Sequence, residues 1–126
     1  MVVVVGDDKI INMEIKNAII SSVVLDTGDR GLLTAWIHLD YGGSGQGFGG
    51  HVLYLPKDFK HFTEKGDFAG HFIFRSMQIA EVGEWSKMKG KTVRVRIENG
   101  LAVAIGHIVK DDWFCPGDDF KRMSGK

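Results

Sequence analysis

Residues 92–108 read TVRVRIENGLAVAIGHI, a pattern typical of a two-stranded antiparallel hairpin. Apolar and polar side chains alternate over Thr92–Glu98, Asn99-Gly100 is a preferred type I′ turn, and Leu101–Ile108 returns. Tight-turn geometry predicts that three branched residues face three very small ones, pairing Ile97 with Ala102, Val95 with Ala104 and Val93 with Gly106. That face therefore leaves room for a helix to lie close.

The opposite face of the hairpin mixes arginine with apolar side chains. It is predicted to carry Arg94, Arg96, Leu101, Val103, Ile105 and His107. So much apolar surface beside arginines indicates a face that another subunit or sheet covers.

One main helix and several further strands are expected outside the hairpin. The helix is predicted over about residues 68–82, with Gly83 as its C-cap, because apolar and small residues recur at helical spacing. Further strands are predicted at Met13–Leu25, Leu32–Asp40, His51–Leu55 and within Lys110–Pro116, and Trp85 is expected to plug the core from a single turn. Residues 1–8 are a loose lead-in or an edge strand, and residues 117–126 a frayed tail. We therefore predict one α+β domain over residues 1–126, mostly antiparallel sheet, that dimerises through β elements.

The composition excludes several classes of function. Lys plus Arg equals Asp plus Glu, so the net charge of zero argues against a protein that coats DNA or an anionic membrane. Cys115 is the only cysteine, which rules out an internal disulfide and a cysteine-based metal site and fits a reducing cytoplasm. The N-terminal MVVVV is too short for a signal-peptide core, and no apolar run approaches the length of a membrane span.

The glycine-rich segment YGGSGQGFGG, Tyr41–Gly50, contains a G-x-G-x-x-G pattern at residues 45–50. A dinucleotide-binding turn needs a helix after the last glycine, whereas HVLYLP has the period of a strand and ends in Pro56. The segment is instead interpreted as a link between two strands, which lets a ligand or another backbone come close. Phe48 either stacks on a base or enters the core, and Gln46 offers both a donor and an acceptor.

The stretch DRGLLTAWIHLDYGGSGQGFGG, followed downstream by GHIVKDDWF, resembles the phage Thoeris anti-defence "sponge" family. The resemblance covers residues 13–116. It implies a protein that binds and sequesters the cyclic ADP-ribose isomers made by bacterial TIR-domain enzymes, without degrading them. It also implies a homodimer with two ligand pockets at the subunit boundary, hexamers and a second site for cyclic oligonucleotides in some members, and action in the host cytoplasm.

A ligand of that class needs a stacking surface, donors for its phosphates and polar groups for its ribose hydroxyls. The ligand-binding candidates are Gln46, Gly47, Phe48, Gly49, Arg75, Arg96, Lys110, Asp112, Trp113 and Phe114. The glycine N–H groups, helped by Arg75 or Lys110, would hold phosphate, and Trp113 or Phe114 would stack on adenine. The alternatives are a solvated Arg75, an ordinary outward strand charge at Arg96 and a core role for Trp113.

The five histidines are scattered, and no pair has the spacing of a helical zinc motif. We therefore expect no catalytic residues, no metal and no cofactor. Two alternatives stay open, namely a phosphodiesterase that destroys the signal and a small phage protein that inhibits a defence protein by direct contact.

Overall fold

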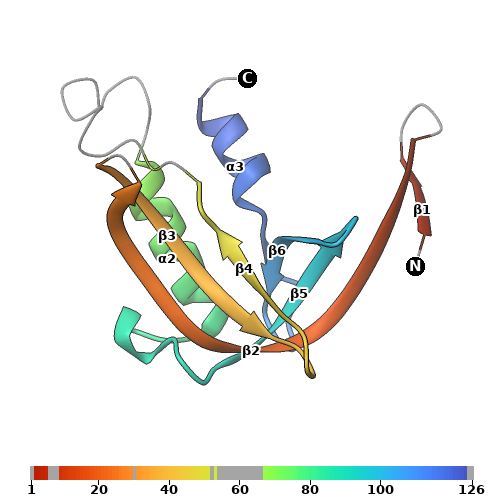
Figure 1. Ribbon diagram of the computed structural model, residues 1–126, viewed down its shortest axis with the longest axis horizontal. Helices are drawn as coiled ribbons and strands as arrows, with labels where there is room; N and C mark the ends of the chain where they lie inside the picture. Colours follow the sequence, from red (N-terminus) through yellow and green to blue (C-terminus); the bar gives the residue numbers. More distant parts are fainter. Residues whose placement is uncertain (1, 6–8, 30, 52, 54–66, 125–126) are drawn as a thin grey trace.

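The computed structural model describes residues 2–5, 9–29, 31–51, 53 and 67–124, which form one α+β domain (Figure 1). The strands are β1 (Val2–Val5), β2 (Lys9–Asp29), β3 (Leu32–Asp40), β4 (Gly45–Gly49), β5 (Thr92–Glu98), β6 (Leu101–Gly106) and β7 (Trp113–Phe114). The helices are α2 (Phe68–Ala80), the short 3-10 helix η2 (Trp85–Lys87) and α3 (Pro116–Met123). The predicted fold class is confirmed: antiparallel sheet dominates and α2 is the main helix.

The long strand β2 organises the sheet. Its Met13–Ile19 half pairs with β5, its Ile19–Asp29 half pairs with β3, and its start pairs with β1. The strand order is therefore β4-β3-β2-β5-β6-β7, with β1 off this path. The register with β3 shifts between Ile20 and Ser22 and again between Asp26 and Asp29, and bulges of this kind bend a strand. Figure 1 shows the result, because β2 sweeps through a wide U-shaped curve.

The curved sheet brings β4 beside the start of β6, although no ladder joins these two strands. The carboxamide of Gln46 spans the gap instead. Its Nε2 donates to the carbonyl of Gly100 at 2.5 Å, and its Oε1 accepts from the N–H of Ala102. One side chain thus supplies the donor and the acceptor that a main-chain peptide group would supply.

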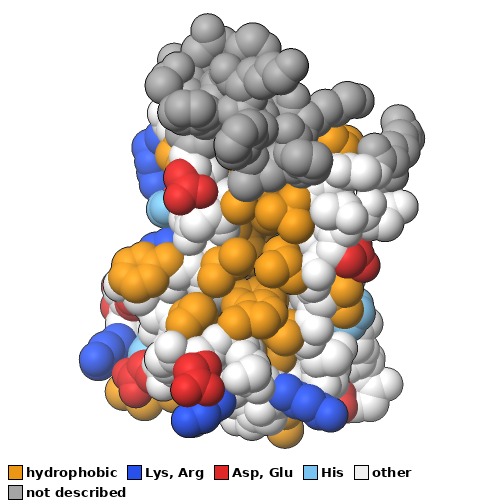
Figure 2. Space-filling model, turned by 90° about the vertical axis from the view of Figure 1, so that its left-hand side faces the viewer, with side chains coloured by type: hydrophobic (Ala, Val, Ile, Leu, Met, Phe, Trp, Pro, Cys, Tyr) orange, Lys and Arg blue, Asp and Glu red, His pale blue; other side chains and the backbone are white. Residues whose placement is uncertain are grey.

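The core lies between the sheet and α2. Phe48 of β4, Phe72 of α2 and Phe114 of β7 are all buried, with ring centroids 6.0 Å (Phe48–Phe72) and 5.5 Å (Phe72–Phe114) apart. Asp67 caps α2 by accepting from the N–H of Gly70 at 2.7 Å. Trp85 of η2 packs partly buried against this core, as predicted. Figure 2 shows apolar side chains gathered in the middle of the face seen there, where the core comes near the surface.

The predicted hairpin is present, but its register changes after the first pair. Ile97 faces Ala102 as expected, whereas Val95 faces Ile105 and Arg94 faces Gly106. The extra residue, Val103, is a bulge that turns Ile105 from the outer face into the core, where it is fully buried beside Phe114. Burying an isoleucine stabilises a fold by about 1.5–3 kcal/mol, which helps to offset the ladder pairing disrupted at the bulge.

Other boundaries also differ from the predictions. The strand predicted at His51–Leu55 is wrong at its described residues, because the strand after β3 is the glycine-rich Gly45–Gly49; residues 52, 54 and 55 lie outside the description. The tail is a helix over Pro116–Met123 rather than a frayed end, since Phe120 is buried against Phe68 at 4.6 Å between centroids. Helix α2 ends at Ala80, and Glu81 with φ of 55°, not Gly83, is its left-handed cap.

At the N-terminus, residues 2–5 form the edge strand β1, and residues 6–8 lie outside the description. None of the described helices, the longest of which has 13 residues, is long and apolar enough to cross a membrane.

Gly49→Ala is expected to destabilise the fold much more than Gly100→Ala. Both glycines have positive φ, 114° and 82°, which costs a side chain about 1–2 kcal/mol. A Cβ at Gly49 would also overlap the Ala35 carbonyl oxygen and lie 3.0 Å from Phe72, whereas one at Gly100 meets open space. Urea denaturation should show about 1–3 kcal/mol of additional loss for Gly49→Ala. Equal losses for the two variants would mean that the close packing of β4 on β3 is incorrect.

Candidate functional site

The glycine segment is a hairpin rather than a long loop. The N–H of Tyr41 donates to the carbonyl of Ser44 at 2.9 Å, and Gly42 and Gly43 between them have φ of 74° and 80°, which is the geometry of a type I′ turn. Further along, the N–H of Gly50 donates to Ala35 at 2.7 Å. In an antiparallel ladder, hydrogen-bonded pairs alternate with pairs that make no hydrogen bond. These two bonds show which pairs are which, so the main-chain groups of Gln46 and Phe48 bond to β3. The N–H and C=O groups of Gly45, Gly47 and Gly49 therefore point to the opposite, free edge of β4.

The indole of Trp36 accounts for two of the glycines in this segment, Gly47 in β4 and Gly50 just after it. Trp36, His38 and Asp40 form the outward-facing row of β3, and each lies opposite a glycine of β4. A Cβ on Gly47 would come within 2.8 Å of the Trp36 ring, and one on Gly50 would overlap the ring. The indole thus lies across bare backbone. Trp36 is still 40% exposed, which leaves part of this anchored ring open to solvent.

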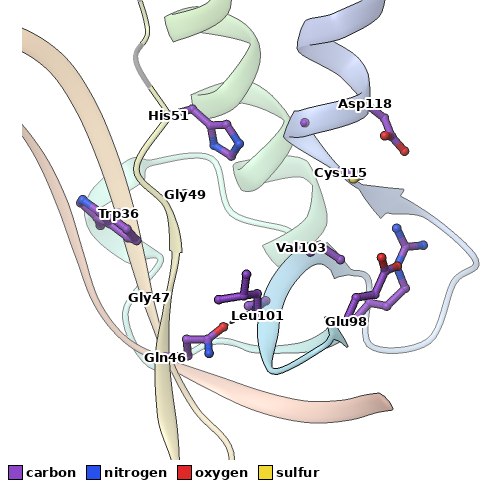
Figure 3. Close-up of a pocket in the computed structure, with 13 residues that line it drawn as sticks. Trp36, Gln46, Gly47, Gly49, His51, Glu98, Leu101, Val103, Cys115 and Asp118 are labelled. Carbon is purple, nitrogen blue, oxygen red and sulfur yellow. Dashed lines mark hydrogen bonds and ion pairs between the residues drawn. The ribbon is translucent and has the colours of Figure 1, made fainter. Parts of the chain in front are cut away.

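A cavity of about 740 Å³ lies beside Trp36, between β4, the β5–β6 hairpin and the start of α3 (Figure 3). Figure 3 shows Trp36 and Glu98 on opposite sides of this cavity, with Leu101 and Val103 between them. Arg96 forms an ion pair with Glu98, in which Nε lies 3.0 Å from Oε2. The angle at Nε is unsuitable for a hydrogen bond. The cavity therefore combines an aromatic surface, a glycine edge, an apolar floor and one cation.

Two further side chains of the cavity have pKa values shifted by burial. His51 has its pKa lowered from 6.5, and its Nδ1 is buried without a hydrogen-bond partner in the described chain. Burial disfavours the imidazolium, so the ring is neutral at physiological pH. Burial also raises the pKa of the Cys115 thiol, which keeps the sulfur protonated and a poor nucleophile. Burial thus holds both side chains in their uncharged forms.

A second cavity, of about 580 Å³, lies along the same strand near the β3–β4 turn. Its walls include Ser21, His38, Asp40 and Ser44, and Gln46 and Gly47 line both cavities. Gln46 and Gly47 are thus a shared boundary of the two cavities.

The predicted ligand residues lie in three different places: the first cavity, the core and a cluster around residues 107–113. Gln46, Gly47, Gly49 and Arg96 meet at the first cavity, as a shared site requires. Phe48 and Phe114 are buried core residues, so the prediction that either ring stacks on a base is wrong for this structure.

Arg75, Lys110, Asp112 and Trp113 lie in a separate cluster around the segment 107–113. Arg75 donates to Asp112 at 2.8 Å and to the carbonyl of Trp113 at 3.0 Å, and it holds the pKa of Asp112 below its ordinary value. Lys110 is exposed, 3.6 Å from Glu81. These contacts fix the loop between β6 and β7.

Trp113 is enclosed on both faces within that cluster. The guanidinium of Arg94 lies 4.8 Å above its ring, and a Cβ on Gly106 would come within 2.7 Å of the indole on the other side. Arg94 also donates to the carbonyls of His107 and Lys110, each at 2.7 Å. Trp113 is therefore a packing residue, as the alternative interpretation held, and Trp36 takes the exposed aromatic position.

Sequence reasoning missed Trp36, His38, Asp40 and His51. A usable signal was present, because in a two-residue hairpin over Gly42-Gly43 every outward residue of β3 falls opposite a glycine. Within residues 2–5, 9–29, 31–51, 53 and 67–124, three or more His, Cys, Asp or Glu side chains do not gather in a metal-binding arrangement. In the comparisons with known proteins, no family model, curated protein or solved structure matches the chain.

Stability is expected to fall as the pH drops below 6.5, and His51→Gln should remove part of this dependence. Because the folded-state pKa of His51 is lowered, the unfolded chain binds the proton first, and the free energy of unfolding therefore decreases with falling pH in that window. Urea denaturation of both proteins between about pH 7.5 and 5.5 measures the difference. If the free energy of unfolding depended on pH equally in the two proteins, His51 would be as solvated in the folded chain as in the unfolded one.

Proposed function

We propose that the protein binds a nucleotide signal of the cyclic ADP-ribose class in the first cavity and holds it intact. The observation that carries this proposal is the anchored, part-exposed indole of Trp36 at the rim of a 740 Å³ cavity. Ligand pockets in proteins commonly span about 300–1,000 Å³. Base–aromatic stacking contributes about 1–3 kcal/mol per base, so one such surface supplies a substantial share of tight binding.

The phosphates of such a ligand have two classes of donor in the cavity. The free-edge N–H groups of Gly47 and Gly49 carry no side chain of their own, and successive backbone donors of this kind suit anions. Arg96 adds a cation whose planar group binds phosphate through two parallel hydrogen bonds. The ion pair with Glu98 keeps that cation at the cavity while no ligand is bound.

Sequestration needs tight binding and no chemical step, which fits the character of the lining groups. Cys115 is kept protonated by burial and Glu98 is paired with Arg96. The family resemblance adds the biological setting, namely a phage protein that blocks Thoeris immunity in the host cytoplasm.

Self-association is part of the same proposal. Ile15 and Ile19 lie on the outer face of β2 at 49% and 51% exposure, beside the arginine-bearing face of the hairpin. An exposed apolar surface of this kind favours coverage by a second copy.

Trp36→Ala is expected to weaken binding of cyclic ADP-ribose isomers by about 5- to 150-fold, because the base loses its stacking surface. Trp36→Phe should retain part of the affinity. Lys110→Ala serves as the control, because Lys110 is exposed and lies outside the cavity. Isothermal titration calorimetry measures all four proteins. Unchanged affinity in Trp36→Ala would exclude Trp36 as the stacking surface, and a loss confined to Lys110→Ala would place the ligand at the 107–113 cluster instead.

Native mass spectrometry of the protein purified from cells that make the signal should show a dimer or higher oligomer carrying one ligand mass per chain. Heating should then release the ligand with its mass unchanged, because the cavity binds without converting it. A hydrolysed product would favour the phosphodiesterase alternative, and an empty protein would favour direct inhibition of a defence protein.

A further inference from the structure

The second cavity adjoins the first along the outer face of the β3–β4 hairpin, because Gln46 and Gly47 line both. Trp36, His38 and Asp40 follow one another on this face of β3, opposite Gly49, Gly47 and Gly45. Residues two apart on a strand are separated by about 6.6–6.8 Å, so the row from Trp36 to Asp40 spans about 13 Å. The glycines leave no side chain on the β4 side of this row. A single ligand can therefore extend from the indole into the second cavity.

The far end of this row is chemically suited to hydroxyl groups. Asp40 is exposed, and its carboxylate makes no hydrogen bond or ion pair with the described part of the chain, so both carboxylate oxygens are available as acceptors. Two acceptor oxygens on one rigid group match the two O–H donors of a vicinal diol. Such bonds are charge-assisted, which makes them stronger than bonds between neutral partners.

Two serines of β2 fix the position of His38 beside Asp40. Ser22 Oγ lies 2.7 Å from Nδ1 of His38, and Ser21 Oγ donates to the His38 carbonyl at 3.1 Å. Both contacts come from the bulged part of β2, where the register shifts between Ile20 and Ser22. The imidazole is thereby fixed through Nδ1, and Nε2 has no partner among the described residues. His38 thus supplies a second fixed polar group beside Asp40.

We propose that the second cavity is a ribose subsite, in which the Asp40 carboxylate accepts hydrogen bonds from the vicinal hydroxyls of a ligand whose base stacks on Trp36. This inference rests on the proposed function and specifies its ligand further. The ligand carries a base that reaches Trp36 and a free vicinal diol that reaches Asp40, at the other end of the same row of β3. Gln46, which lines both cavities, lies where the two parts of the ligand join.

The test is a cycle of two proteins and two ligands measured by isothermal titration calorimetry. The proteins are the wild type and Asp40→Asn; the ligands are a cyclic ADP-ribose isomer and its analogue that lacks one hydroxyl of the vicinal pair. Asp40→Asn should weaken the diol ligand by about 10- to 100-fold, the size expected for hydrogen bonds to a charged group. It should change the affinity for the deoxy analogue much less, because that analogue cannot make the paired contact.

Asp111→Asn is the matched control, since it removes the same charge from an exposed carboxylate outside both cavities. It should leave both affinities unchanged. Equal weakening of the two ligands by Asp40→Asn, or no weakening of either, would overturn the ribose subsite. In both of those cases a loss of binding in Trp36→Ala would leave the proposed function standing. Failure of the wild type to bind any cyclic ADP-ribose isomer would overturn both proposals together.

Discussion

The contact between Gln46 and the β5–β6 turn determines the shape of the ligand-binding region. A sheet with two open edges exposes unpaired peptide groups, and here the curvature of β2 brings the edge of β4 beside the start of β6. The Gln46 carboxamide joins them through the carbonyl of Gly100 and the N–H of Ala102 without a continuous ladder. If the ladder continued, the edges would close and the first cavity would vanish. A single side-chain bridge instead holds the edges together and leaves the glycine edge open beyond it.

The strand β4 is constrained on both faces as well as at its edge. Phe48 enters the core between Phe72 and Phe114, while the indole of Trp36 covers the glycines on the other face. A strand this poor in side chains has little intrinsic tendency to form, since glycine loses more conformational freedom on folding than any other residue. Packing from both sides offsets that cost. The same arrangement fixes the ring of Trp36, and a pre-positioned aromatic surface binds a base with little further loss of entropy.

The two tryptophan–glycine contacts have different consequences for function. Trp113 lies on Gly106 and is covered by Arg94, so its second face is occupied within the chain. Trp36 lies on Gly47 and Gly50 and keeps part of its ring exposed at a cavity. The sequence pointed to Trp113 and not Trp36 as a stacking surface, although the two residues are of the same type. The position of Arg94 on the neighbouring strand distinguishes them, and that position depends on which residues of β5 and β6 face each other.

The sequence by itself determined the elements whose signals are local. Alternation and Asn99-Gly100 specified the β5–β6 hairpin, and helical spacing specified α2 to within two residues of its end, because both depend on neighbours along the chain. Of the ten residues that the sequence proposed for one ligand site, Gln46, Gly47, Gly49 and Arg96 line the first cavity. Only the tertiary structure decided the bulge at Val103, the burial of Phe48 and Phe114 and the helix α3, because each depends on contacts between segments far apart in sequence. The exposed position of Trp36 belongs to the same class, since strand register and sheet curvature, rather than local preference, place its ring beside the cavity.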